Sequence, residues 1–169
     1  MNNIDIVKRM DDLGRVVIPK ELRRILKLCS NEPLKISIED NKIVMKKYSL
    51  LSEFENVIKK FGEIINKISS KNVLITNRDK IIYSNIKEFT DKEISESLKM
   101  KIINREEING LSNLEIIDGI TRRSYYYSNI ILINSEINGI IIIFDNVNSI
   151  EEKDKILIKV ISEIFNYSL

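Results

Sequence analysis

The chain of 169 residues is 43% hydrophobic and 31% charged, which is typical of a folded protein with one domain or two small ones. It contains no histidine, which excludes histidine-based catalytic triads and the commonest zinc ligand, and its single cysteine excludes an internal disulfide. No apolar run approaches the roughly eighteen residues of a membrane span, and no leader-like segment opens the chain, so we expect a cytoplasmic protein without membrane contact.

The net charge of +2 conceals an uneven distribution. Residues 1–50 hold eleven Lys and Arg against seven Asp and Glu, whereas residues 51–169 hold sixteen against eighteen. The positive charge is therefore concentrated in the first third of the chain.

The first elements are short and closely spaced. Alternation of apolar and polar residues predicts a strand over Ile4–Met10, and the β-branched run Val16–Ile18 predicts a second one. Between them lies a turn in which Gly14 takes a positive φ and Asp12 braces the backbone. Pro19 then suits the first turn of a helix.

The helix after Pro19 is amphipathic, with Leu22, Ile25 and Leu26 on one face. The alternating segments Leu34–Glu39 and Lys42–Tyr48 follow as two strands joined by a tight hairpin at Asp40-Asn41. Residues 1–50 therefore form a β-turn-β-α-β-turn-β unit.

This unit of about fifty residues is too small to bury a sufficient core by itself. Composition excludes disulfides and metals as substitutes, which leaves association with a second copy. We predict an obligate, intertwined homodimer, which would present two symmetric basic surfaces to two half-sites of a DNA duplex.

Residues 51–169 predict a second, α+β unit with the order α-β-β-α-β-β-β-α and an antiparallel sheet. Ser52 begins the first helix, with Glu55 completing a capping box, and the helix ends near Ser69. The other elements are strands at 73–75 and 81–83, a helix at 91–103, an irregular segment at 104–113, strands at 114–117, 124–133 and 140–144, and a helix at 149–167.

A set of basic side chains surrounds the first turn and helix: Lys8, Arg9, Arg15, Lys20, Arg23 and Arg24. Lysines and arginines on a rigid mount suit phosphates, and one or two arginines suit base edges. The alternative is a solvated helix face with ordinary turn charges. Their clustering in a unit that must dimerise favours binding to double-stranded DNA.

The block Val7–Arg24, centred on Asp12-Leu13-Gly14-Arg15-Val16-Val17-Ile18-Pro19, resembles the DNA-binding domain of the AbrB family of transition-state regulators, and Lys46-Lys47-Tyr48 matches the end of that domain. The resemblance implies a swapped-hairpin β-barrel dimer over 1–50, with Lys8, Arg9, Arg15, Arg23 and Arg24 facing DNA. It also implies a GAF-like sensor domain over 51–169, tetramer formation, and activation or repression of sporulation genes.

Two positions depart from the family pattern. Lys8 stands where arginine is common, which removes bidentate geometry there. The turn Ser30-Asn31-Glu32-Pro33 lacks the usual glycine.

The remaining candidate residues offer weaker signals. Tyr125-Tyr126-Tyr127 beside Arg122 and Arg123 suggests a small-molecule cavity, but a core face and a surface face explain the tyrosines better. The glycines form no phosphate loop, so no cofactor is expected and any ligand stays unknown. Cys29 fits a buried apolar site better than a redox sensor.

The apolar stripes of the helices at 52–69 and 149–167 either cover the sheet or also pack against another subunit, which with the N-terminal dimer would give a homotetramer. The chemistry of an enzyme is absent from these patterns. Two other functions stay open: an antitoxin of the swapped-hairpin type, and a ligand sensor that uses residues 1–50 for dimerisation alone.

Overall fold

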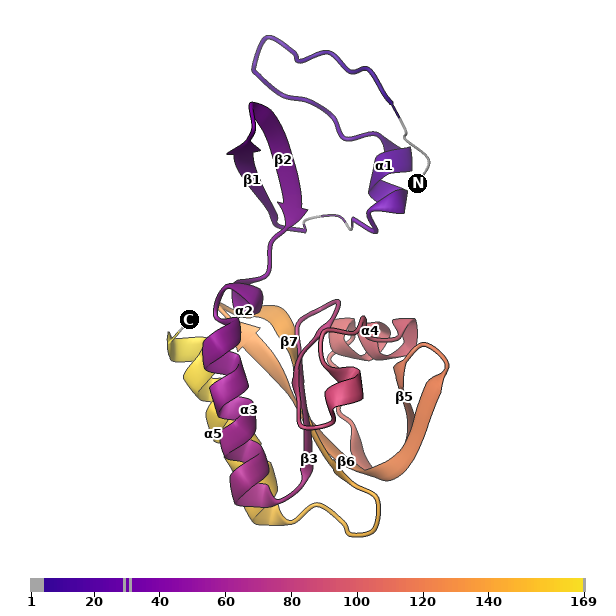
Figure 1. The fold of residues 1–169 in the computed structure, drawn as a ribbon, viewed down its shortest axis with the longest axis vertical. Helices are drawn as coiled ribbons and strands as arrows, with labels where there is room; N and C mark the ends of the chain where they lie inside the picture. Colours follow the sequence, from indigo (N-terminus) through magenta and orange to yellow (C-terminus); the bar gives the residue numbers. More distant parts are fainter. Residues whose placement is uncertain (1–4, 29, 31, 169) are drawn as a thin grey trace. The chain divides into compact units, whose positions relative to one another are not determined.

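The computed structural model describes residues 5–28, 30 and 32–168 (Figure 1). These residues form two compact units that divide between Tyr48 and Ser49. Cys29 and Asn31, for which the sequence predicted a buried site and a turn, lie outside the described residues. No helix in the described ranges is long and apolar enough to span a membrane.

The first unit, up to Tyr48, contains one helix and one hairpin. Helix α1 (Lys20–Ile25) begins directly after Pro19, and β1 (Leu34–Glu39) pairs antiparallel with β2 (Lys42–Lys47). Asp40 and Asn41 take φ values of 49° and 60°, as a tight hairpin with two left-handed residues requires. The helix and this hairpin confirm the predictions for these segments.

The two strands predicted at 4–10 and 16–18 do not form within one chain, and this part of the prediction is wrong for the single chain. Described residues 5–18 carry no strand, although Asp11 N donates to Arg15 O at 3.0 Å across the turn. A strand needs a neighbour for its backbone groups, and β1 and β2 pair only with each other.

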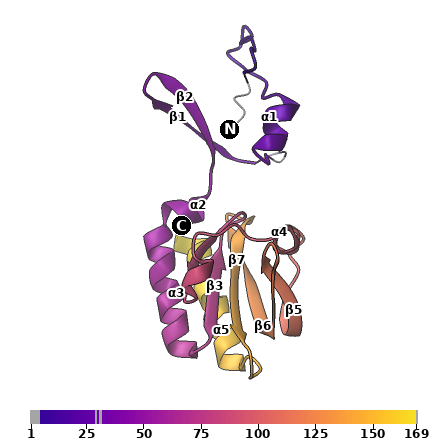
Figure 2. The same ribbon diagram turned by 45° about the vertical axis from the view of Figure 1, so that its right-hand side comes forward.

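The second unit is built on a five-stranded antiparallel sheet with the order β4-β3-β7-β6-β5. Figure 2 shows β3, β7, β6 and β5 in this order. This α+β architecture and its element order confirm the prediction. The strands are β3 (Asn72–Thr76), β4 (Ile81–Ser84), β5 (Asn109–Ile117), β6 (Ile120–Ile133) and β7 (Glu136–Asp145).

Successive side chains of the strands point alternately into two apolar cores, one on each face of the sheet. On one face lie α2 (Leu50–Glu53), α3 (Glu55–Ser69) and α5 (Glu152–Ser168). On the other lie the 3-10 turn η1 (Lys87–Phe89), the segment around Ile94 and α4 (Glu96–Ile103). The sheet therefore separates two layers that share no apolar core.

Several predicted boundaries in this unit are wrong. The strands expected at 124–133 and 140–144 already begin at Ile120 and Glu136, because β6 pairs with both of its neighbours along its length, and the helix expected at 149–167 begins at Glu152. The first helix is capped by Ser49 and not by Ser52, and it is interrupted at Phe54. Glu55 does not complete a capping box, because its side chain is hydrogen-bonded to Lys59. The helix expected at 91–103 begins at Glu96 because the Ser95 hydroxyl caps it. The segment 104–113 was expected to be irregular, but β5 already begins at Asn109, since pairing with β6 outweighs its polar composition.

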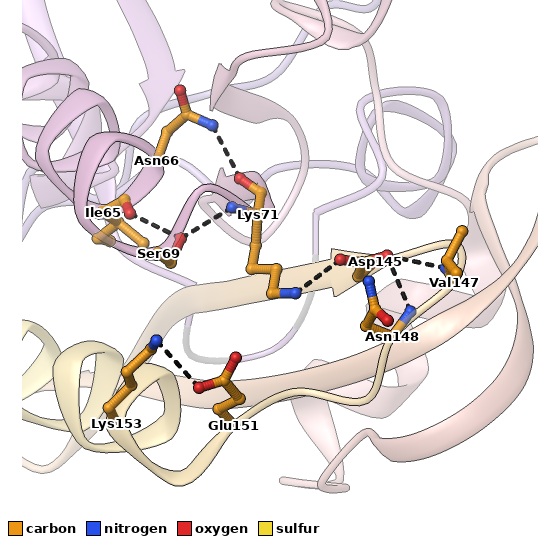
Figure 3. Close-up of polar contacts among 9 residues, drawn as sticks. All are labelled: Ile65, Asn66, Ser69, Lys71, Asp145, Val147, Asn148, Glu151 and Lys153. Carbon is orange, nitrogen blue, oxygen red and sulfur yellow. Dashed lines mark hydrogen bonds and ion pairs between the residues drawn. The ribbon is translucent and has the colours of Figure 1, made fainter.

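A lysine–carboxylate pair fastens the end of α3 to the end of β7 (Figure 3). Lys71 Nζ lies 2.6 Å from Asp145 Oδ2, and the backbone N–H groups of Val147 and Asn148 donate to Asp145 Oδ1 at 2.8 and 3.1 Å. The Lys71 bond and the two N–H groups hold the pKa of Asp145 far below its usual value.

We predict that Asp145→Asn lowers the free energy of unfolding by about 1–2 kcal/mol at pH 7, because it removes the charge that three donors stabilise. A depressed carboxyl pKa stabilises the fold above the unfolded-state pKa, and the gain is lost as the pH falls below about 4. Denaturant titrations between pH 7 and pH 3 should therefore show that the free energy of unfolding falls more steeply for the wild type than for Asp145→Asn. The exposed-carboxylate control Asp12→Asn should follow the wild type, and parallel pH profiles for all three would contradict the prediction.

Candidate nucleic-acid interface

The turn after Met10 is held by Asp11. Its Oδ1 accepts hydrogen bonds from Leu13 N at 3.0 Å and Arg15 N at 2.8 Å, while Oδ2 lies 2.8 Å from Arg15 Nε. Gly14 closes the turn with φ 75°. The prediction that Asp12 braces this turn is wrong, because the neighbouring carboxylate makes all three bonds.

Asp11 also orients the guanidinium of Arg15. The backbone amide and side chain of Arg15 lower the pKa of Asp11, which keeps the carboxylate ionised. The Arg15 side chain stays largely exposed beside it. The turn therefore presents a positioned arginine edge at the surface, a role for Asp11 that its Asx-turn spacing to Leu13 could have indicated.

Helix α1 carries three more of the predicted basic residues. It starts where Arg23 N donates to Pro19 O at 3.0 Å, and Lys20, Arg23 and Arg24 all point to solvent. Lys8 and Arg9 are exposed in the segment before the turn. Among the described residues, no ion pair or side-chain hydrogen bond engages these five basic side chains, which leaves them available to phosphates.

The first unit has no interior of its own. None of its described residues is buried, and many apolar side chains are exposed. Cross-strand pairs Ile36–Met45 and Ile38–Ile43 lie on one face of the hairpin, with Ile38 at 81% exposure. A groove of about 300 Å³, lined by apolar side chains of α1, Leu28, β1 and β2 and by Lys46 and Lys47, adds to this unfilled apolar surface.

No family model matches the sequence. Stage V sporulation protein T of Bacillus subtilis (strain 168) is 34% identical over 151 residues, which cover 85% of each chain. This chain belongs to the family of stage V sporulation protein T. Its first unit also matches the transition state regulatory protein AbrB of the same organism, with 50% identity over 48 residues, or 28% of this chain and 50% of AbrB.

Two solved structures are similar to portions of this member of the stage V sporulation protein T family. The N-domain of the transcription factor abrB covers 29% of the chain at 49% identity, with a TM-score of 0.27. The cofactor-binding GAF domain of the nutrient sensor CodY from Clostridium difficile covers 71% at 13% identity, with a TM-score of 0.48.

Two of the three consecutive tyrosines of β6 belong to the apolar cores. Tyr126 and Tyr127 enter the cores on opposite faces of the sheet, and burial raises the pKa of Tyr126, whose hydroxyl donates to Arg122 O at 2.8 Å. The Arg122 guanidinium lies 5.4 Å from the ring centroid of Phe89 and is half-buried, while Arg123 is exposed.

Helices α3 and α5 lie side by side and carry an exposed apolar strip (Figure 1). Phe61 and Phe165 join them in an edge-to-face contact with centroids 5.1 Å apart. The strip comprises Phe54, Val57, Ile64, Ile68, Ile156, Val160, Ile164 and Tyr167. So many neighbouring exposed apolar side chains are typical of a subunit interface.

A substitution at Asp11 tests whether its carboxylate holds the turn. Asp11→Ala removes all three bonds, so the amides of Leu13 and Arg15 should exchange with solvent about tenfold faster, because both lose their hydrogen-bond acceptor. Asp11→Asn keeps an acceptor for both amides and should exchange at nearly the wild-type rate. NMR-detected exchange measures both variants, and equal rates in Asp11→Ala and wild type would contradict this role.

Proposed function

We propose that this chain is a transcriptional regulator that binds double-stranded DNA through paired basic surfaces of its first unit. The observation that carries the proposal is the set of exposed basic side chains on a unit without a core: Lys8, Arg9, Arg15, Lys20, Arg23 and Arg24. The similarity of the same segment to AbrB, which is named a transition state regulatory protein, supports it.

Binding is mainly electrostatic in this proposal. The lysines and arginines neutralise phosphates and release counterions, while Arg23 or Arg24 at the exposed face of α1 reaches base edges. Arg15 is held by Asp11 and enters the complex with its orientation already set. The remaining specificity comes from the shape and flexibility of the duplex.

We propose that the first unit acts as a swapped-hairpin homodimer. A unit with no buried side chain cannot offset the conformational entropy lost on folding. A second copy would cover the apolar hairpin face and the groove, and would supply partners for the extended segments at 5–10 and 16–18. Two-fold symmetry would then duplicate the basic surface.

We further propose a tetramer in which the strip on α3 and α5 packs against the same strip of another chain. The strip lies on the side of these helices that the sheet does not cover, so the two interfaces of the tetramer would be independent. Residues 49–169 would then act as an oligomerisation and GAF-like sensor domain.

The genes controlled by this regulator are proposed to be those of sporulation, activated or repressed according to the gene. The name of stage V sporulation protein T, similar over 85% of the chain, supports this role. Small-molecule sensing by the second unit is a further candidate function. A polar hollow of about 230 Å³ between β6 and α5, lined by Arg105, Asn129, Ser162 and others, favours it.

Replacing two arginines of α1 tests the DNA interface. Arg23→Ala with Arg24→Ala should weaken binding by about tenfold or more and reduce the salt slope by about one per lost phosphate contact. Fluorescence anisotropy with a labelled duplex, selected by the wild-type chain from a random-sequence pool, measures both. The control Lys60→Ala with Lys67→Ala removes the same charge from exposed positions of α3 and should bind normally. Unchanged affinity in the arginine variant would contradict the proposed interface.

Two aspartate substitutions test the two proposed interfaces separately. Sedimentation of the full chain should give a tetramer for the wild type and a dimer for either Ile38→Asp or Val160→Asp, because each buries a charge in one apolar interface. The double variant should sediment as a monomer. Ser37→Asp, on the opposite face of β1, serves as the control, and a tetramer for both single variants would contradict the assignment.

A further inference from the structure

The turn between β3 and β4, residues 77–80, is fixed by a buried asparagine. Asn77 is 5% exposed, and its Oδ1 accepts hydrogen bonds from Asp79 N at 2.8 Å and Lys80 N at 2.7 Å. Its Nδ2 donates to Ser52 Oγ at 2.9 Å. One side chain therefore shapes the turn and ties it to α2, which is 25 residues earlier in the chain.

A close backbone approach sets the position of this turn. A Cβ atom on Gly139 of β7 would lie 1.9 Å from Thr76 O, so only glycine allows β7 to come this near to the end of β3. Thr76 is fully buried directly before Asn77. The turn therefore has a rigid base in the sheet.

The same turn also contacts the start of α3. Lys80 Nζ lies 4.0 Å from Glu55 Oε2, and Glu55 Oε1 accepts a hydrogen bond from Lys59 Nζ at 2.6 Å. The Lys59 bond, with a smaller effect of Lys80, lowers the pKa of Glu55 and keeps it ionised. The turn is thus connected to the α2–α3 layer by a hydrogen bond and an ionic contact.

Other groups of the turn contact the layer on the opposite face of the sheet. Asp79 O accepts a hydrogen bond from Ile94 N at 2.9 Å, and Asp79 Oδ1 lies 3.9 Å from the ammonium of Lys99 in α4, a lysine with 9% exposure. Lys80 Nζ also lies 3.8 Å from Asp91 Oδ1. The turn therefore bridges two layers whose apolar cores are separate.

The chain leaves no spare residue between α2 and the first unit. Tyr48 N donates to Pro33 O at 2.9 Å within the first unit, and the next residue, Ser49, already caps α2. The last residue hydrogen-bonded within the first unit and the cap of α2 are therefore joined by a single peptide bond.

We propose that the turn 77–80 couples the layer formed by residues 87–103 to α2 and, through it, to the DNA-binding unit. Ser52 and Asn77 are the positioning residues of this coupling. A ligand or contact that shifts the layer 87–103 changes DNA affinity through the turn, and by linkage DNA binding changes the stability of α4. This inference rests on the proposed function in DNA binding.

Hydrogen exchange of the full chain, with and without the labelled duplex described above, tests the coupling. DNA should change the exchange of amides in residues 96–103 by about twofold or more in the wild type and in Ser52→Thr, which retains the hydroxyl. Ser52→Ala removes only the acceptor for Asn77, so it should bind DNA and melt almost as the wild type does, while the response in residues 96–103 is lost.

The possible results distinguish a failure of the proposed coupling from a failure of the proposed function in DNA binding. If the wild type binds DNA but residues 96–103 do not respond, or if the response persists in Ser52→Ala, the coupling is wrong and the proposed function stands. Lys80→Gln, which weakens the contacts to Glu55 and Asp91 without touching Ser52, should reduce the same response and serves if Ser52→Ala is unstable. If the wild type does not bind DNA, the proposed function fails and the coupling fails with it.

Discussion

The lack of buried side chains is the main physical constraint on the first unit. Its described residues include a well-formed hairpin and a short helix, yet none of them is buried. Because folding must offset conformational entropy by burying apolar area, the exposed apolar residues of this unit support the proposed homodimer. In that proposal, the pairing of the basic surfaces and the dimerisation depend on the same apolar residues.

The second unit, in contrast, is well buried: it has two apolar cores, one on each face of its sheet. Rigid burial of this kind leaves few places where one layer can influence the other. The turn 77–80 is such a place, since Asn77 contacts Ser52 on one side while Asp79 contacts Ile94 and Lys99 on the other. The proposed coupling between the layer 87–103 and the first unit depends on this connection.

Sequence reasoning was most reliable where periodicity and turn chemistry agree. The hairpin at Asp40-Asn41, the strands on either side of residues 77–80 and the two long apolar helices were predicted from such patterns. Helix starts were predicted poorly because several serines and acids compete as caps, and the backbone around Ser49 and Ser95 decided between them. The edge strand β5 was missed in part because its polar residues gain stability from pairing with β6.

By itself, the sequence determined which residues are basic, where they cluster and which family the motif resembles, because these depend on composition and local spacing. Only the tertiary structure decided which two layers the turn 77–80 joins, with Asp79 contacting Ile94 and Lys99. It alone brought Asn77 to Ser52. Contacts between residues distant in the chain depend on how strands and helices pack, and no local pattern encodes that packing.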